Sequence, residues 1–169
     1  DNYFNDYPKL GVWPDAYYMT APLFEGPVFG HGMFAMNRSK MLTGDPSAEL
    51  VFFDLTLAVP GLQRILPADV DGPAPPAGTP NYVLTMAADE FGDPADAYRL
   101  FEVHVDWNDL DNSTMTELPS LPSAAFDPTF TEVSGNCGFA FTSRDDIEQP
   151  APANCGMRVD ALSGRPMHR

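Results

Sequence analysis

The chain has 169 residues, of which 44% are hydrophobic, so it can bury a core and is not a wholly disordered polymer. Its 24 acidic residues outnumber 9 basic ones, and the net charge of −15 disfavours nucleic acid as a partner because an acidic surface repels phosphates. The 18 prolines and 13 glycines favour short strands joined by turns over long helices.

The first third of the chain predicts three strands. Residues 11–20 have the pattern of a strand interrupted by Pro14. Residues 28–37 predict a second strand, in which two glycines mark a bulge or a close backbone approach. After a turn at 43–46, the near-continuous apolar run 50–57 has the length and composition of a strand buried on both faces.

The rest of the chain alternates loops with strands. Residues 60–80 contain six prolines and predict an extended surface loop. Strands are then predicted at 81–87 and at 98–107, which is the clearest strand of the sequence. Beyond them we expect a proline- and serine-rich loop at 117–128, weak strands near 129–133 and 138–142, and a short helical turn around 158–163.

These elements, about seven or eight short strands without a long helix, predict an all-β fold: a sandwich, a barrel or the blades of a propeller. No repeat of about 40–50 residues supports a WD40-type array. A coarser similarity exists, because the order strand, aromatic strand, acidic loop, strand occurs near 10–57 and again near 64–107.

The two cysteines of the chain, Cys137 and Cys155, are informative about the redox conditions in which the protein resides. A bridge between them would close a loop of about 19 residues and contribute roughly 3 kcal/mol on the chain-entropy model. The even count favours an oxidising, secreted or periplasmic setting, although two free thiols remain an alternative. A zinc site on this pair is not expected, because no neighbouring CxxC or HxxxH completes it.

The two ends of the sequence suggest a piece of a longer chain. It begins at Asp1 without an initiator Met or a signal peptide, and it ends at Arg169 within a polar segment. No apolar run reaches the roughly 18 residues needed to span a membrane, so no membrane span is expected. Blades of a partial propeller would expose unpaired edges, which predicts self-association of an isolated fragment.

One strand carries the sharpest group of candidate catalytic and metal-binding residues. Glu102, His104 and Asp106 alternate with apolar neighbours and share one face of the strand 98–107. An imidazole between two carboxylates can bind a divalent metal such as Zn²⁺ or act as an acid–base pair. The alternative is a solvated strand face with locally hydrogen-bonded side chains.

A second candidate metal site lies in the proline-rich loop. Asp69 and Asp71 precede Gly72, and alternating carboxylates with a turn glycine resemble the start of a calcium-binding loop. The distant bidentate Glu of an EF-hand is missing, so a plain Asp-rich turn is the competing interpretation. Residues 109–112 suggest the same possibility more weakly.

Aromatic residues near the start of the chain form a candidate ligand platform. Trp13, Tyr17 and Tyr18 surround Asp15, and aromatic rings can stack on sugar faces while a carboxylate accepts hydroxyl hydrogen bonds. Aromatic residues in strands also serve as core, which is the alternative. If the protein were a glycosidase, Asp15 with Asp106 or Asp71 would be the carboxylate pair to test.

Several of these segments resemble stretches of large, mostly uncharacterised bacterial secreted proteins. The segments are residues 6–20 (DYPKLGVWPDAYYMT), 66–72 (LPADVDG), 75–82 (PPAGTPNY), 103–107 (VHVDW) and 160–169 (DALSGRPMHR). The resemblance implies a sialidase-like or glycosidase-like β-propeller architecture, of which this chain would be a middle portion. Its blades would be residues 1–60, 61–128 and, in part, 129–169. The family has no assigned activity to transfer, and residues 129–157 depart from its pattern.

Two functions follow from these observations. The first is an extracellular β-propeller-like module that binds a glycan, another small molecule or a cell surface, or that forms a scaffold. The second is a metal-assisted or carboxylate-based hydrolase of glycans or esters, centred on Glu102, His104 and Asp106. A divalent Ca²⁺ or Zn²⁺ ion is the expected cofactor of either, if there is one.

Overall fold

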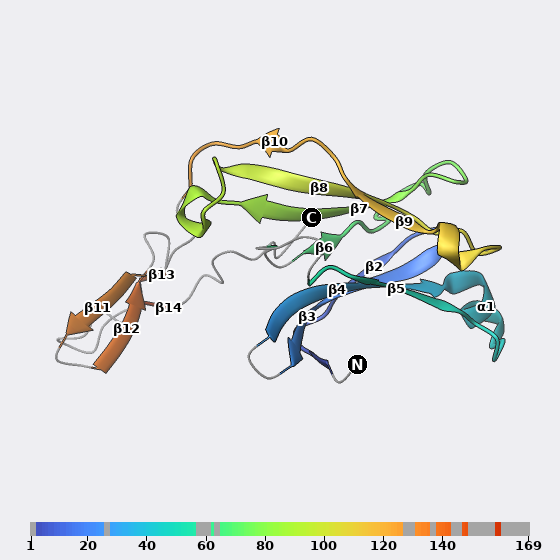
Figure 1. Ribbon diagram of the computed structural model, residues 1–169, viewed down its shortest axis with the longest axis horizontal. Helices are drawn as coiled ribbons and strands as arrows, with labels where there is room; N and C mark the ends of the chain where they lie inside the picture. The colour runs from blue at the N-terminus through green and yellow to red at the C-terminus, as the bar shows by residue number, and fades with distance from the viewer. Residues whose placement is uncertain are drawn as a thin grey trace.

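The computed structural model describes most of the chain up to residue 126 (Figure 1). The described residues are 3–25, 28–56, 62 and 65–126, together with the strands Thr131–Gly135, Gly138–Thr142, Ile147–Glu148 and Arg158–Val159. The last four strands, β11 to β14, form two antiparallel pairs, β11 with β12 and β13 with β14.

The first sheet, sheet A, is built from consecutive antiparallel strands. They are β1 (Phe4–Asn5), β2 (Lys9–Val12), β3 (Ala16–Glu25), β4 (Val28–Asn37) and β5 (Leu50–Asp54). Because β1 and β2 pair with opposite halves of β3, the five strands make a sheet that is four strands wide.

The second sheet, sheet B, repeats this plan. Its strands are β6 (Leu66–Pro67), β7 (Asn81–Ala87), β8 (Ala97–His104), β9 (Thr114–Glu117) and β10 (Leu121–Pro122). Here β9 and β10 pair with opposite halves of β8, so this sheet is also four strands wide. Short 3-10 turns, η1 (Asp89–Phe91) and η2 (Leu110–Asn112), lie in its two main loops.

The two sheets pack face to face around one hydrophobic core (Figure 1). Alternate residues of each strand point inward, as expected for half-buried antiparallel sheets. Sheet A contributes Ala16, Tyr18, Met33 and Ala35, and sheet B contributes Val83, Phe101 and Val103. Buried Leu55, Leu62 and Ile65, from the connection between the sheets, complete this core with Val105.

Strand β2 of sheet A lies beside β6 of sheet B, which joins the layers along one edge. The amide of Val70 donates to the carbonyl of Val12 at 3.0 Å, and the amide of Val12 donates to Oδ1 of Asp69 at 2.7 Å. The approach requires a glycine at position 11, because an added Cβ would lie 2.3 Å from the carbonyl oxygen of Ala68. The hydroxyl of Thr20 adds a buried bond to the carbonyl of Ile65 at 2.6 Å.

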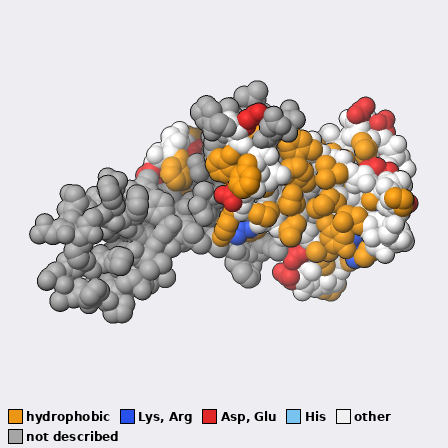
Figure 2. All heavy atoms as spheres, turned by 90° about the horizontal axis from the view of Figure 1, so that it is seen from below, with side chains coloured by type: hydrophobic (Ala, Val, Ile, Leu, Met, Phe, Trp, Pro, Cys, Tyr) orange, Lys and Arg blue, Asp and Glu red, His pale blue; other side chains and the backbone are white. Residues whose placement is uncertain are grey.

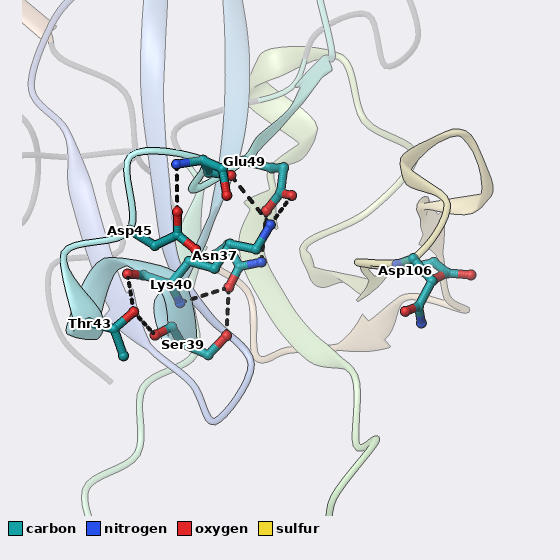
Figure 3. Close-up of polar contacts among 9 residues, drawn as sticks. Asn37, Ser39, Lys40, Thr43, Asp45, Glu49 and Asp106 are labelled. Atoms are coloured by element: carbon teal, nitrogen blue, oxygen red, sulfur yellow. Dashed lines mark hydrogen bonds and ion pairs between the residues drawn. The ribbon is translucent and has the colours of Figure 1, made fainter.

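A short helix, α1 (Arg38–Thr43), connects β4 to β5 and is closed at both ends by hydrogen bonds (Figure 3). Oδ1 of its N-cap, Asn37, accepts from the Lys40 amide at 3.2 Å, the usual way to satisfy a free first-turn amide. Gly44 ends the helix in the left-handed conformation, with φ 67°. Lys40 also forms an ion pair with Glu49, which ties the helix to the chain entering β5.

The all-β prediction is confirmed, and three of the predicted strands match the structure to the residue: 28–37 is β4, 81–87 is β7 and 138–142 is β12. The strand at 98–107 is β8, which ends at His104. The two glycines of β4 produce no bulge, since its register with β3 is continuous; they allow close packing against Phe52 and Thr56 instead.

Other expectations were wrong in detail. Residues 11–20 are parts of two strands, with Pro14 in the turn between β2 and β3. The run 50–57 is not buried on both faces, because the side chains of Leu50 and Phe52 are exposed. Residues 60–80 are not wholly a surface loop, since Leu66 and Pro67 form a buried strand. Sequence patterns could not show which face of sheet A carries exposed apolar side chains, such as Leu50 and Phe52.

Candidate functional site

A small cavity lies at the end of the molecule where turns of both sheets meet. Its volume is about 100 Å³. Pro14 and Asp15 line it from the β2–β3 turn, Pro76 and residues 78–80 line it from the loop before β7, and residues 103–105 line it from the end of β8. The cavity therefore brings together two of the predicted catalytic residues, Asp15 and His104.

Asp15 is the most unusual group of this cavity. Its Oδ2 accepts a hydrogen bond from the hydroxyl of Tyr18 at 3.0 Å. Its Oδ1 is buried and has no hydrogen-bond partner among the described residues. Buried acceptors without a partner are rare because leaving one unsatisfied costs about 1–3 kcal/mol, more for a charged group. A hydrogen-bond donor that reached this oxygen would remove the cost.

Tyr18 supports the carboxylate from the core side. Its side chain is 0% exposed, and burial, reinforced by the charge of Asp15 and the hydrogen bond to it, raises the pKa of the Tyr18 hydroxyl well above its usual value of 10.0. The hydroxyl is therefore a permanent donor to Asp15 at neutral pH. The ring lies in the core, so the expectation that Tyr18 stacks on a ligand is wrong.

Trp13 and Tyr17, the other two predicted ligand-binding rings, have different surroundings. Trp13 packs against the core, and its Nε1 donates to the carbonyl of Thr79 at 3.0 Å, which fixes the loop that lines the cavity. Tyr17 is half-buried on the outer face of sheet A, with the guanidinium of Arg38 5.8 Å from its ring centroid. Neither ring lines the cavity, so neither ring would contact a ligand bound in it.

The three residues predicted to form a site on β8, Glu102, His104 and Asp106, lie in three different environments. Val103 is buried and His104 exposed, so the expected alternation of faces holds. Oε2 of Glu102 accepts from the hydroxyl of Tyr82 at 3.4 Å. Asp106 lies beyond the end of the strand, where its Oδ1 accepts from the backbone amides of Asn108 at 2.9 Å and Asp109 at 3.2 Å. These bonds lower the pKa of Asp106 and hold its carboxylate in its own turn.

The described residues do not bring the predicted metal ligands into a chelating group. Donor atoms of Glu102, His104 and Asp106 are not all within 4.8 Å of one another, the spacing that a shared ion needs. Asp69 is engaged with the amide of Val12, and Asp71 lies exposed in a bend.

One group of three carboxylates does meet that spacing in the described part of the chain: Asp89, Glu90 and Asp96, around η1. The sequence analysis missed it, although Asp89 and Glu90 are adjacent and Asp96 follows six residues later. Asp96 also accepts from the amides of Asp89 at 3.2 Å and Phe126 at 2.8 Å, so it organises the loop by itself.

No family model, curated protein or solved structure matches this chain, so its function has to be argued from its own geometry. Within the described residues, no helix is long and apolar enough to cross a membrane. Cys137 and Cys155, with the predicted bridge between them, lie outside the described residues.

Proposed function

We propose that this chain is an extracellular binding module of β-propeller type, whose cavity takes one hydroxyl-bearing end of a glycan or another small polar ligand. The observation that carries the proposal is that Asp15, whose Oδ1 is buried without a described hydrogen-bond partner, lines the cavity. A carboxylate oxygen in a partly desolvated cavity is a strong acceptor for a ligand hydroxyl.

The order of the strands supports the propeller architecture. Two consecutive antiparallel meanders, each four strands wide, pack face to face. The edge strands β2 and β6 are adjacent, as are the innermost strands of successive blades around a propeller axis. The strands come from residues 4–54 and 66–122, ranges that lie within the first two blades expected from the sequence.

The size and the walls of the cavity indicate what it takes. At about 100 Å³ it is smaller than the roughly 300–1,000 Å³ of sites that enclose a whole drug-sized ligand. It therefore fits one end of a ligand, with the rest outside. Prolines and valines in the wall offer contacts to C–H groups, while Asp15 accepts a hydroxyl hydrogen bond, a combination suited to the edge of a sugar ring.

The hydrolase remains a second candidate because Asp15 and His104 line the same cavity. A carboxylate and an imidazole can share acid–base work on a bound ester or glycoside. A carboxylate pair is harder to assemble, since neither Asp106 nor Asp71 is among the lining residues. Hydrolysis assays with glycoside and ester substrates separate the candidates: turnover that is lost in His104→Ala and in Asp15→Asn would favour the hydrolase.

The experiment for the binding module is a glycan array with the wild-type protein, followed by calorimetry on the sugars that bind. Asp15→Asn keeps the size of the side chain and an acceptor for Tyr18 but removes the charge. We expect it to weaken binding about tenfold or more, as is typical for a lost charge-assisted hydrogen bond. Asp71→Asn, an equal change on an exposed carboxylate outside the cavity, should bind like the wild type. Equal binding by all three proteins would refute the assignment of the site.

A further inference from the structure

The outer face of sheet A carries two rows of apolar side chains that run across all four strands. The register aligns one residue from each of β2, β3, β4 and β5 in each row. The first row is Leu10, Met19, Phe34 and Phe52; the second is Val12, Tyr17, Met36 and Leu50. The rings of Phe34 and Phe52 stack with centroids 4.8 Å apart. We call these eight residues the sheet A outer face.

This face is exposed. Leu10 is 61% exposed, Leu50 50%, Val12 42% and Phe52 37%. Seen from below sheet A, the hydrophobic side chains form a continuous area (Figure 2). None of the eight residues is charged, although the chain has 24 acidic residues. A contiguous, uncharged apolar area on the surface of a soluble protein is a candidate interaction site.

A charged residue of opposite sign borders each end of the face along the strands. Beyond the second row, the Arg38 guanidinium lies over the Tyr17 ring, and it makes no ion pair among the described residues. Beyond the first row, Asp54 is the next residue of β5 after Phe52 on the same face of the strand, and it pairs with Gly32 of β4. Asp54 is exposed, and its Oδ1 accepts from the Thr56 amide at 2.9 Å.

We propose that the sheet A outer face docks on the same face of a second copy of this chain, in a two-fold dimer. A two-fold axis in the interface and perpendicular to the strands turns the partner's strands end for end. This rotation places Arg38 of each copy at the end of the interface where Asp54 of the other copy lies, so the opposite charges meet at both ends. The apolar rows of the two copies then face each other. Charge complementarity thus favours a second copy over a partner of unrelated charge pattern.

The dimer is expected to be weak. Four strands about 4.8 Å apart and two rows about 7 Å apart give a flat footprint of roughly 250 Å² per copy, well under the ~800 Å² per partner of a stable complex. The net charge of −15 also makes two copies repel each other at long range. Added salt screens this repulsion, so we expect association in the micromolar range or weaker, strengthened by salt.

This contact differs from the association through unpaired strand edges that the sequence suggested, because it uses a face of the sheet. It also goes beyond the proposed binding function and does not depend on it, since none of the eight residues lines the cavity.

Sedimentation velocity over about a hundredfold range of concentration tests the proposal. The wild type should shift from monomer to dimer, and Leu10→Glu and Leu50→Glu should each weaken the dimer about tenfold or more by placing charge in the apolar rows. The matched control is Leu121→Glu on sheet B, a leucine that is 52% exposed, which should behave as the wild type. A wild type that stays monomeric at every concentration and salt would overturn the proposal, as would unchanged association of both face variants.

A charge exchange then tests the two-fold arrangement itself. Arg38→Asp and Asp54→Arg should each weaken the dimer, because each places like charges opposite one another. Mixed together, the two single variants should form heterodimers, and the double variant should associate like the wild type. Circular dichroism checks that each variant is folded. Failure of both the mixture and the double variant to recover association would overturn the arrangement, whatever the glycan experiments show.

Discussion

The hydroxyl of Tyr18 donates to Oδ2 of Asp15 at 3.0 Å, while Oδ1 of the same carboxylate is buried without a described partner. One oxygen is thus held by the core of the molecule, and the residue that carries both oxygens lines the cavity. A core tyrosine therefore positions the carboxylate, and in the proposed function the unpartnered oxygen is the acceptor for a ligand hydroxyl.

Tyr18→Phe should destabilise the protein by about 1–3 kcal/mol, because it leaves a buried carboxylate with neither oxygen paired. Urea unfolding measures the change in the free energy of unfolding. Tyr98→Phe is the control, since Tyr98 is 45% exposed and its change should be close to zero. Equal stability of the Tyr18 variant and the wild type would show that the hydrogen bond contributes nothing.

Alkaline pH should unfold the protein in a way that depends on Tyr18. Its pKa is raised in the folded state, mainly by burial, while the unfolded chain ionises near the usual 10.0. The folded state therefore retains a proton that the unfolded state loses, and stability falls as pH rises above about 10. Urea unfolding at a series of alkaline pH values should show this slope. In Tyr18→Phe the slope should be smaller, and an identical slope would contradict the assignment.

The connection from β4 to β5 should lose stability in acid. The Lys40 ammonium donates to Glu49 and holds the pKa of that carboxyl below its usual 4.5, and hydrogen bonds from Ser47 lower the pKa of Asp45 (Figure 3). Because both pKa values are lower in the folded state, the stabilisation is present above the ordinary values and is lost as pH falls through the folded ones. NMR titration should show the Glu49 pKa rising in Lys40→Met, with that of Asp45 changing little. An unchanged Glu49 pKa would contradict the ion pair.

Gly11→Ala should separate β2 of sheet A from the chain that follows β6 of sheet B. The added Cβ would lie 2.3 Å from the Ala68 carbonyl oxygen, a clash with backbone that a side-chain rotation cannot relieve. We expect a loss of about 1–3 kcal/mol in the free energy of unfolding. Gly72→Ala is the matched control, because its Cβ would meet nothing within 4 Å, and its change should stay within about 0.5 kcal/mol. Similar losses for both variants would argue against the close approach.

Local patterns predicted the strands well where side-chain alternation was uninterrupted. NYVLTMA became β7 with alternating burial, and the segment 28–37 became β4. Pro14 was taken as an interruption of one strand, whereas it lies in a turn, because a proline cannot donate to a ladder and the chain reverses there. The short helix α1 was missed because six residues carry too weak a periodicity to detect.

The candidate site was predictable only in part, as Asp15 and His104 show. Both were candidates on residue type and neighbours, but they were assigned to different sites. They line one cavity because the β2–β3 turn and the end of β8 meet, although 88 residues lie between them in the sequence. Glu102 and Asp106, close to His104 in sequence, are held by Tyr82 and by backbone amides instead.

The sequence by itself determined the class of the fold, because proline, glycine and period-two alternation act over a few residues and allow little else than short antiparallel strands. Only the tertiary structure decided which alternating faces meet. Tyr18 and Tyr17 are neighbours of the same residue type, yet one is core and the other lies on an exposed face. That difference depends on which side of sheet A faces sheet B, and contacts between distant segments set it.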